Sequence, residues 1–145
     1  MIALLQRVTE ASVTIGGRPR GAIGPGLVAL IGVRPSDGAR EGERLLDRIL
    51  RYRIFGDEQG RMNRSVADLR GGLLLVPQFT LAANTTKGLR PGFSHAAPPE
   101  QARALFEALV ARAHERHAPV ESGVFGADMQ VSLTNDGPVT IWLES

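Results

Sequence analysis

The sequence contains no cysteine. Disulfides, a thiol nucleophile and zinc or iron–sulfur sites with cysteine ligands are therefore excluded. It also lacks any apolar run near the roughly 20 residues that span a bilayer. Its first residues do not show the basic segment, apolar segment and cleavage site of a signal peptide. We expect a cytoplasmic protein that does not associate with a membrane.

Lysine is almost absent, because Lys87 is the only one among 17 basic residues. The others are arginines, which make forked contacts to phosphate or carboxylate groups. The formal net charge is nevertheless only +2, and aromatic residues make up 5% of the chain. A general DNA- or RNA-binding module is disfavoured, since it needs a strongly basic face and several aromatic rings for stacking.

The 145 residues are enough for one domain with a substantial core, which we expect to span residues 1–145. Alternating or short apolar segments predict strands at 2–15, 27–33, 52–55, 72–82, 120–125, 129–133 and 139–143. One helix is predicted from a cap at Ser36 or Asp37 to about Arg51, and a second opens at Pro98 and Pro99. The pattern indicates an α+β fold with an antiparallel or mixed sheet and two main helices.

Two apolar segments are interrupted by proline. Pro77 lies within 72–82, and Gly137 and Pro138 lie within the stretch VSLTNDGPVTIWLE. Proline cannot donate to a sheet ladder, and glycine weakens a strand interior. Each interruption alone indicates a bulge or an edge strand. Together they indicate two places where backbone groups are free of ladder pairing and can line a pocket.

No complete catalytic set is visible in the sequence. It has no phosphate-binding loop, dinucleotide fingerprint or nucleophile elbow. His114 and His117 have a spacing that can hold a metal, but we favour two solvated cations at a helix end. His95 has no carboxylate partner nearby in sequence, and Thr80 has no base that would make it a nucleophile. We therefore predict neither a metal nor a cofactor.

Five blocks resemble the D-aminoacyl-tRNA deacylase family. They are MIALLQRVTEASV, YRIFGDEQGRMN, QFTLAA, KGLRPGFS and DMQVSLTNDGPVTIWL, in the family's order along the whole chain. Both of the family's signature motifs are among them. The resemblance implies a barrel-like sheet and a homodimer with active sites at the subunit interface. It also implies hydrolysis of the ester that joins a D-amino acid, or glycine, to the terminal adenosine of tRNA.

The resemblance also implies how L-amino acids are rejected. In the family, the equivalent of Gly137–Pro138 has a cis peptide bond and reaches into the partner's active site. Rigid main-chain oxygens there would occupy the space that an L-side chain needs. A D-side chain would point elsewhere, and glycine would also enter.

For the reaction, the resemblance places Gln78, Phe79 and Thr80 around the adenosine and the scissile carbonyl. We expect the Phe79 main-chain amide to be an oxyanion donor, Thr80 to position the substrate, and the tRNA 2′-hydroxyl to assist attack by water. Phe125 and Met129 would then pack around the terminal adenosine.

Two basic residues follow this motif in a loop. Lys87 and Arg90 are expected either to contact acceptor-stem phosphates or to remain solvated.

One position departs from the family pattern, because Pro77 stands where serine usually precedes Gln-Phe-Thr-Leu. A hydroxyl and an N–H are lost there. A related deacylase group with a different mischarged tRNA also has this proline, but it has alanine in place of Phe79. Two alternatives therefore stay open: a deacylase with shifted specificity, and a tRNA-binding dimer without catalysis.

Overall fold

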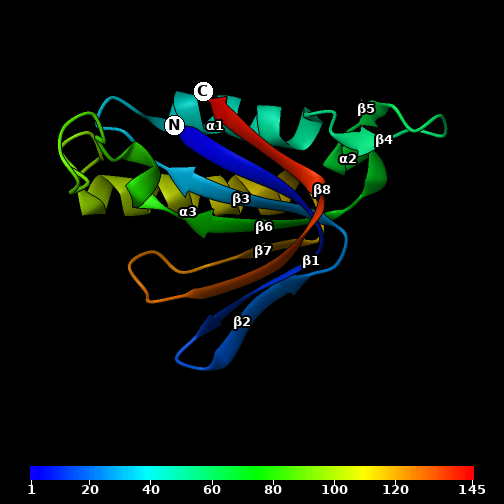
Figure 1. Ribbon diagram of the computed structural model, residues 1–145, viewed down its shortest axis with the longest axis horizontal. Coiled ribbons are helices and arrows are strands. Elements are labelled where there is room, and N and C mark those ends of the chain that lie inside the picture. Colours follow the sequence, from blue (N-terminus) through cyan, green and yellow to red (C-terminus); the bar gives the residue numbers. More distant parts are fainter.

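The centre of the fold is one long, curved strand, β1 (Ile2–Ile15). A computed structural model describes residues 1–145. One side of β1 pairs with β3 (Gly26–Gly32) and then with β2 (Arg18–Ile23), and the other side pairs with β8 (Gln130–Glu144). All three pairings are antiparallel. Because β1 is so long, its first half can pair with β3 and its second half with β2, while β8 runs along its other side (Figure 1).

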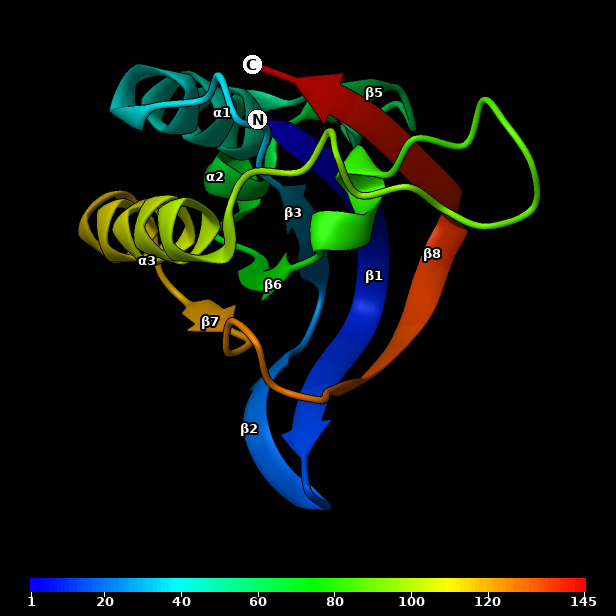
Figure 2. The ribbon, with the colours of Figure 1, turned by 90° about the vertical axis from the view of Figure 1, so that its left-hand side faces the viewer.

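The remaining strands make the sheet mixed. β6 (Gly72–Pro77) lies parallel to β3, and β7 (Val120–Ser122) lies parallel to β6. In order of pairing, the sheet runs β2-β1-β3-β6-β7. β2 and β3 share one side of β1, and β8 pairs along its other side. The sheet curls until it is nearly barrel-shaped (Figure 2). The prediction of an α+β fold with a mixed sheet is confirmed.

Two long helices cover one face of the sheet (Figure 2). They are α1 (Ala39–Arg51) and α3 (Pro99–Arg116), and their apolar sides join the larger core cluster with β1, β3 and β6. Short elements complete the chain: β4 (Phe55–Gly56), β5 (Met62–Arg64), α2 (Val66–Leu69) and the 3-10 helix η1 (Phe79–Ala82). The two predicted main helices are confirmed. None of the helices is long and apolar enough to cross a membrane.

The predicted cap of α1 is wrong. Gly38 is the N-cap residue, and the Glu41 carboxylate accepts its N–H at 2.9 Å. Asp37 is used elsewhere: its carboxylate accepts from the N-terminal amine of Met1 at 2.7 Å and from the Arg34 N–H at 2.6 Å. The side chain that resembled a helix cap thus joins the chain's start to the β3–α1 connection.

Several predicted strands are shorter in the structure. The segment 72–82 leaves the sheet after Pro77 and continues as η1, so Thr80 lies in a 3-10 turn. The strand predicted at 120–125 ends at Ser122, and only Phe55 of the stretch 52–55 is in a strand. Propensity identified these three apolar segments correctly but overestimated how far they pair.

Pro77 fits the end of β6 without losing a ladder bond. The Leu73 N–H donates to the Pro119 oxygen beside β7, and the Gln78 N–H donates to the Ile31 oxygen on β3. Since successive strand N–H groups face opposite neighbours, position 77 faces the β7 side. That strand has already ended at Ser122, so no acceptor needs the missing N–H.

The strands predicted at 129–133 and 139–143 are one strand, β8. It runs from Gln130 to Glu144 and contains both Gly137 and Pro138. The pairing with β1 is irregular rather than broken there.

Candidate active site

A pocket of about 700 Å³ opens at the carboxyl end of β6, between η1, the start of α3 and the segment before β8. Figure 2 shows this end of the molecule facing the viewer. Five of the predicted site residues line it: Pro77, Gln78, Phe79, Phe125 and Met129. Most of the other lining residues are small or apolar. The chain thus brings together two segments that are almost fifty positions apart.

Two lining residues of the pocket, Pro77 and Met129, pack closely against Gly123. A Cβ added to Gly123 would lie 2.7 Å from the Met129 sulfur and 3.2 Å from Pro77 Cδ. The Val124 N–H also donates to the Met129 sulfur at 3.4 Å. Glycine after β7 therefore leaves room for Pro77 and Met129, which both line the pocket.

Thr80 does not line this pocket. Its hydroxyl is exposed and accepts a hydrogen bond from the Gln78 side-chain amide. No histidine or carboxylate makes a hydrogen bond with this hydroxyl. This hydroxyl therefore has no base beside it that would make it a nucleophile.

Phe79 stands at the mouth of the pocket with half of its surface exposed (50%). Its ring contacts the ring of Phe93 at a centroid distance of 5.0 Å, with a tilt of 56°. Phe79 also begins η1, and the first N–H groups of a helix have no acceptor inside it. A main-chain donor is therefore available at the pocket mouth.

Arg103 is a residue of this site that sequence analysis missed. Its guanidinium carbon lies 5.1 Å from the centroid of the Phe125 ring, in cation–π contact. It lies on α3 four positions after Pro99, which lines the pocket. Only the knowledge that the first turns of α3 face the site would have selected it from among 16 arginines.

Gly137 and Pro138 lie in β8, both are exposed, and neither lines the pocket. Val8 pairs with Asn135 and Gln6 pairs with Thr140, so the four residues 136–139 stand opposite the single residue Arg7. We call residues 136–139 the β8 bulge. The Gly137–Pro138 peptide bond is cis.

Arg7, the residue of β1 opposite the β8 bulge, donates a hydrogen bond to its backbone. Its Nε donates to the Asp136 main-chain oxygen at 2.9 Å, and its Nη1 donates to the Ile54 oxygen at 2.7 Å. Gly137 has φ +150°, and a Cβ there would lie 2.7 Å from the Val139 nitrogen. The backbone of the bulge therefore requires glycine at this position.

The remaining candidates lie apart from the pocket lining. His117 Nε2 is 2.7 Å from the Gly71 oxygen at the end of α3, and His95 is exposed. No three His, Asp or Glu side chains come together as metal ligands. Lys87 and Arg90 are exposed in the loop between η1 and α3, which extends outward past β8 (Figure 2).

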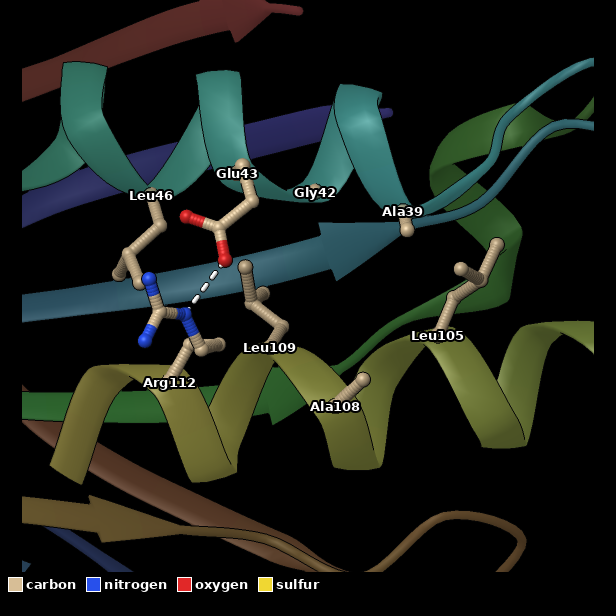
Figure 3. Close-up of a pocket in the computed structure, with 8 residues that line it drawn as sticks. All are labelled: Ala39, Gly42, Glu43, Leu46, Leu105, Ala108, Leu109 and Arg112. Carbon is tan, nitrogen blue, oxygen red and sulfur yellow. Dashed lines mark hydrogen bonds and ion pairs between the residues drawn. The ribbon is translucent and has the colours of Figure 1, made fainter. Parts of the chain in front are cut away.

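A second hollow lies between α1 and α3, and its volume is only about 70 Å³ (Figure 3). Small and apolar side chains line most of it, and the ion pair between Arg112 and Glu43 lies across it. It contains no nucleophile and no acid–base pair beyond these two ions. It is a packing gap between two helices, and the pocket at β6 is the candidate active site.

Comparison with known proteins identifies the family of this chain. The profile of the family described as D-Tyr-tRNA(Tyr) deacylase matches residues 4–144. The chain belongs to this family. Proteins named D-aminoacyl-tRNA deacylase are 61% identical to it in Azotobacter vinelandii, over the full length of both chains, and 62% identical in Thioalkalivibrio sulfidiphilus, over 99% of this chain and 97% of the relative.

Two solved structures of similar shape extend the comparison. One is titled c-Myc DNA Unwinding Element Binding Protein; it is 43% identical with a TM-score of 0.95 and covers 100% of this chain and 99% of that one. The other is a probable eukaryotic D-amino acid tRNA deacylase, 14% identical with a TM-score of 0.88 over 99% and 98% of the two chains. The second likeness shows that the same fold occurs in a chain whose sequence is largely different.

Proposed function

We propose that residues 1–145 act as one deacylase domain that hydrolyses the ester between a D-amino acid and the terminal adenosine of tRNA. The observation that carries the proposal is the pocket at the end of β6. It gathers Gln78 and Phe79 of one signature block with Phe125 and Met129 from the other end of the chain. The names of relatives about 60% identical over the full length support the same reaction.

The reaction proceeds without a side-chain nucleophile. The Phe79 N–H stabilises the charge that develops on the ester carbonyl oxygen, while Gln78 and Thr80 position the substrate. The terminal adenosine packs against Phe125 and Met129, and Arg103 lies beside it. The tRNA 2′-hydroxyl assists the attack of water, so that a preorganised donor and a bound RNA hydroxyl replace a catalytic triad.

Selection against L-amino acids uses a second copy of the chain. In a homodimer, the β8 bulge of one subunit enters the pocket of the other, and its main-chain oxygens exclude an L-side chain. Three features support this arrangement: Gly137 and Pro138 are exposed, they lie outside their own pocket, and β8 pairs only with β1. Trp142 on β8 is also 48% exposed, and a large apolar ring at the surface favours a face of β8 that a second subunit covers.

Glycyl-tRNA is a substrate on the same grounds, because glycine has no side chain to exclude. A thousand-fold preference for the D-form requires about 4 kcal/mol of differential interaction. A clash with rigid backbone provides such a difference without any polar recognition of the amino acid.

The loop at Lys87 and Arg90 contacts the acceptor stem. The sequence has no Asp or Glu between Asp68 and Glu100, so no acidic side chain of this segment opposes a phosphate. The neck of the loop is closed by paired hydrogen bonds between Asn84 and Gly92, at 2.7 and 3.0 Å. Both cations therefore lie on a loop whose two ends are joined, and Phe93 next to this junction contacts Phe79 at the pocket.

The test is deacylation of D-tyrosyl-, L-tyrosyl- and glycyl-tRNA, each with a normal or a 2′-deoxy terminal adenosine, by wild type and Thr80→Ala. We expect rapid loss of the D and glycyl esters, survival of the L ester, dependence on the 2′-hydroxyl and an active Thr80→Ala variant. Cleavage of the L ester would indicate the alternative, a specificity shifted by Pro77. No cleavage of any ester would leave a tRNA-binding dimer.

The dimer is tested by complementation between subunits. Phe79→Pro removes the donor of the pocket, and Gly137→Ala distorts the β8 bulge. A mixture of the two variants contains heterodimers in which one site has an intact pocket and an intact bulge. Selective D-ester cleavage should return on mixing, and sedimentation should give a dimer. A monomer, or no gain on mixing, would contradict the arrangement.

A further inference from the structure

The β8 bulge contains a hydrogen-bonded closure made by one side chain. Asn135 Oδ1 accepts from the Val139 N–H at 2.7 Å, and Asn135 Nδ2 donates to the Val139 oxygen at 3.1 Å. A single amide thus bonds both main-chain groups of the residue four positions later. These groups stand where β8 does not follow the regular ladder with β1.

Thr140 completes this closure at the point where regular pairing resumes. Asn135 Nδ2 also donates to Thr140 Oγ1 at 3.2 Å, and Thr140 pairs with Gln6 of β1. Gln6 Nε2 lies 3.4 Å from the same hydroxyl. The first and last polar residues of the segment NDGPVT are therefore bonded to each other across the bulge.

The closure joins Asn135 to Val139 and leaves only a short exposed tip between these two residues. Val139 is 8% exposed and belongs to the larger core cluster, so packing fixes this end of the bulge. Asp136, Gly137 and Pro138 form the exposed tip. The position of the tip therefore depends on the bonds that Asn135 makes at its base.

We propose that Asn135, supported by Thr140, is a positioning residue that sets the preference for D- over L-aminoacyl esters. The inference rests on the proposed function, in which the tip excludes the L-side chain. Asn135 contacts no reacting atom in this proposal. It fixes the tip, and steric exclusion works only if the excluding atoms do not yield.

Asparagine is suited to this role because it has an acceptor and a donor at the same distance from the backbone. Aspartate keeps the acceptor for the Val139 N–H but places a second oxygen against the Val139 carbonyl. Alanine loses both bonds. Thr140→Val keeps the shape of the side chain and removes only the hydroxyl that accepts from Asn135.

The experiment measures kcat/KM for D-tyrosyl- and L-tyrosyl-tRNA, together with melting temperature, for Asn135→Ala, Asn135→Asp and Thr140→Val. Thr134→Val is the matched control, because Thr134 is the preceding residue of β8, is exposed and makes no side-chain hydrogen bond. We expect the D/L ratio to fall at least ten-fold in both Asn135 variants and about three-fold in Thr140→Val. The control should keep the wild-type ratio.

The inference is overturned if folded Asn135 variants keep the wild-type ratio, including the case in which D and L rates fall equally. If Asn135→Ala does not fold, the milder Asn135→Asp and Thr140→Val variants decide by the same ratio. A wild type that cleaves both enantiomers equally, or neither, would contradict the proposed function itself. The failure of one statement is therefore distinguishable from the failure of the other.

Discussion

The pocket at the end of β6 is walled mainly by apolar side chains from separate parts of the chain, whereas the β8 bulge is held by the polar side chains of Arg7 and Asn135. Packing spreads the effect of one substitution over many neighbours, but a hydrogen bond disappears entirely with its donor or acceptor. In the proposed function, chemistry and selection therefore depend on different residues and different forces. Mutation should be able to separate them.

The largest effect is expected in the pocket, from Phe79→Pro. Proline removes the main-chain N–H but is tolerated at the first position of a helix. Loss of one oxyanion donor lowers kcat by roughly 10²–10³. Single-turnover hydrolysis of D-tyrosyl-tRNA should show this loss, with the D/L ratio little changed.

Phe79→Ala is the matched control for that experiment, because it removes the ring and keeps the N–H. It should cost much less in kcat than Phe79→Pro. Equal losses in the two variants would assign the effect to the ring and its contact with Phe93, and would refute the role of the amide.

The second effect is expected in the β8 bulge, from Arg7→Leu. The Asp136 and Ile54 oxygens would lose their donor, and the side chain that provides it is only 16% exposed. Ile54 is buried, and an unsatisfied buried polar group costs about 1–3 kcal/mol, so the loss at the Ile54 oxygen should lower the melting temperature. The D/L ratio should fall about ten-fold, with a smaller loss of D-ester cleavage.

Arg51→Leu serves as the control for Arg7→Leu, since it removes the same charge from an exposed residue of α1. It should keep the wild-type ratio. A parallel loss of D and L cleavage in Arg7→Leu would mean that this arginine supports the fold alone.

Local patterns were sufficient for most of the fold. The apolar stripes of α1 and α3 and the apolar strands β1, β3 and β6 are visible in the sequence because each repeats at the period of its own backbone. The pocket residues came from the resemblance and from no periodicity. Physical inspection of QFTL suggested a strand, although the segment turns into η1 directly after the sheet ends.

The β8 bulge shows why the rest was not predictable. The sequence indicated a bulge or an edge strand at Gly137 and Pro138, and the structure has a bulge there. It also divided the segment into two strands, at 129–133 and 139–143, where the structure has one. The strand continues because Arg7, 129 positions earlier, and Asn135 bond the freed backbone groups. Such compensation depends on the pairing of β1 with β8, and no local window contains it.

A smaller effect is expected in the loop that carries Lys87 and Arg90. Lys87→Ala with Arg90→Ala should raise KM for aminoacyl-tRNA several-fold. It should also reduce the slope of log kcat/KM against log salt by roughly 0.7–0.9 for each phosphate that the loop no longer neutralises. The control is Arg51→Ala with Arg53→Ala. This pair removes the same charge at the carboxyl end of α1, away from the pocket. An equal change of slope in both pairs would indicate a general charge effect and no docking loop.

The smallest effect is expected at the end of β8, beyond the bulge, where Glu144 is paired with Arg34 at 2.8 Å and accepts from Trp142 Nε1 at 3.1 Å. The hydrogen bond from Arg34 is the main cause that lowers the pKa of Glu144 from its ordinary value of 4.5 to about 2. Between these two values the unfolded chain binds more protons, so the pair stabilises the fold above about pH 4.5, and this stability is lost as the pH falls towards 2.

Because both side chains of this pair are more than a third exposed, water and salt screen it, and we expect a contribution of about 1 kcal/mol. Urea unfolding of wild type and Glu144→Gln at pH 6 and pH 3 measures it. The variant should lose less stability than wild type between the two pH values and should keep the D/L ratio. A changed D/L ratio would mean that the Arg34–Glu144 pair at the end of β8 also positions the bulge. Selection would then depend on the whole second half of β8 and not on the bulge alone.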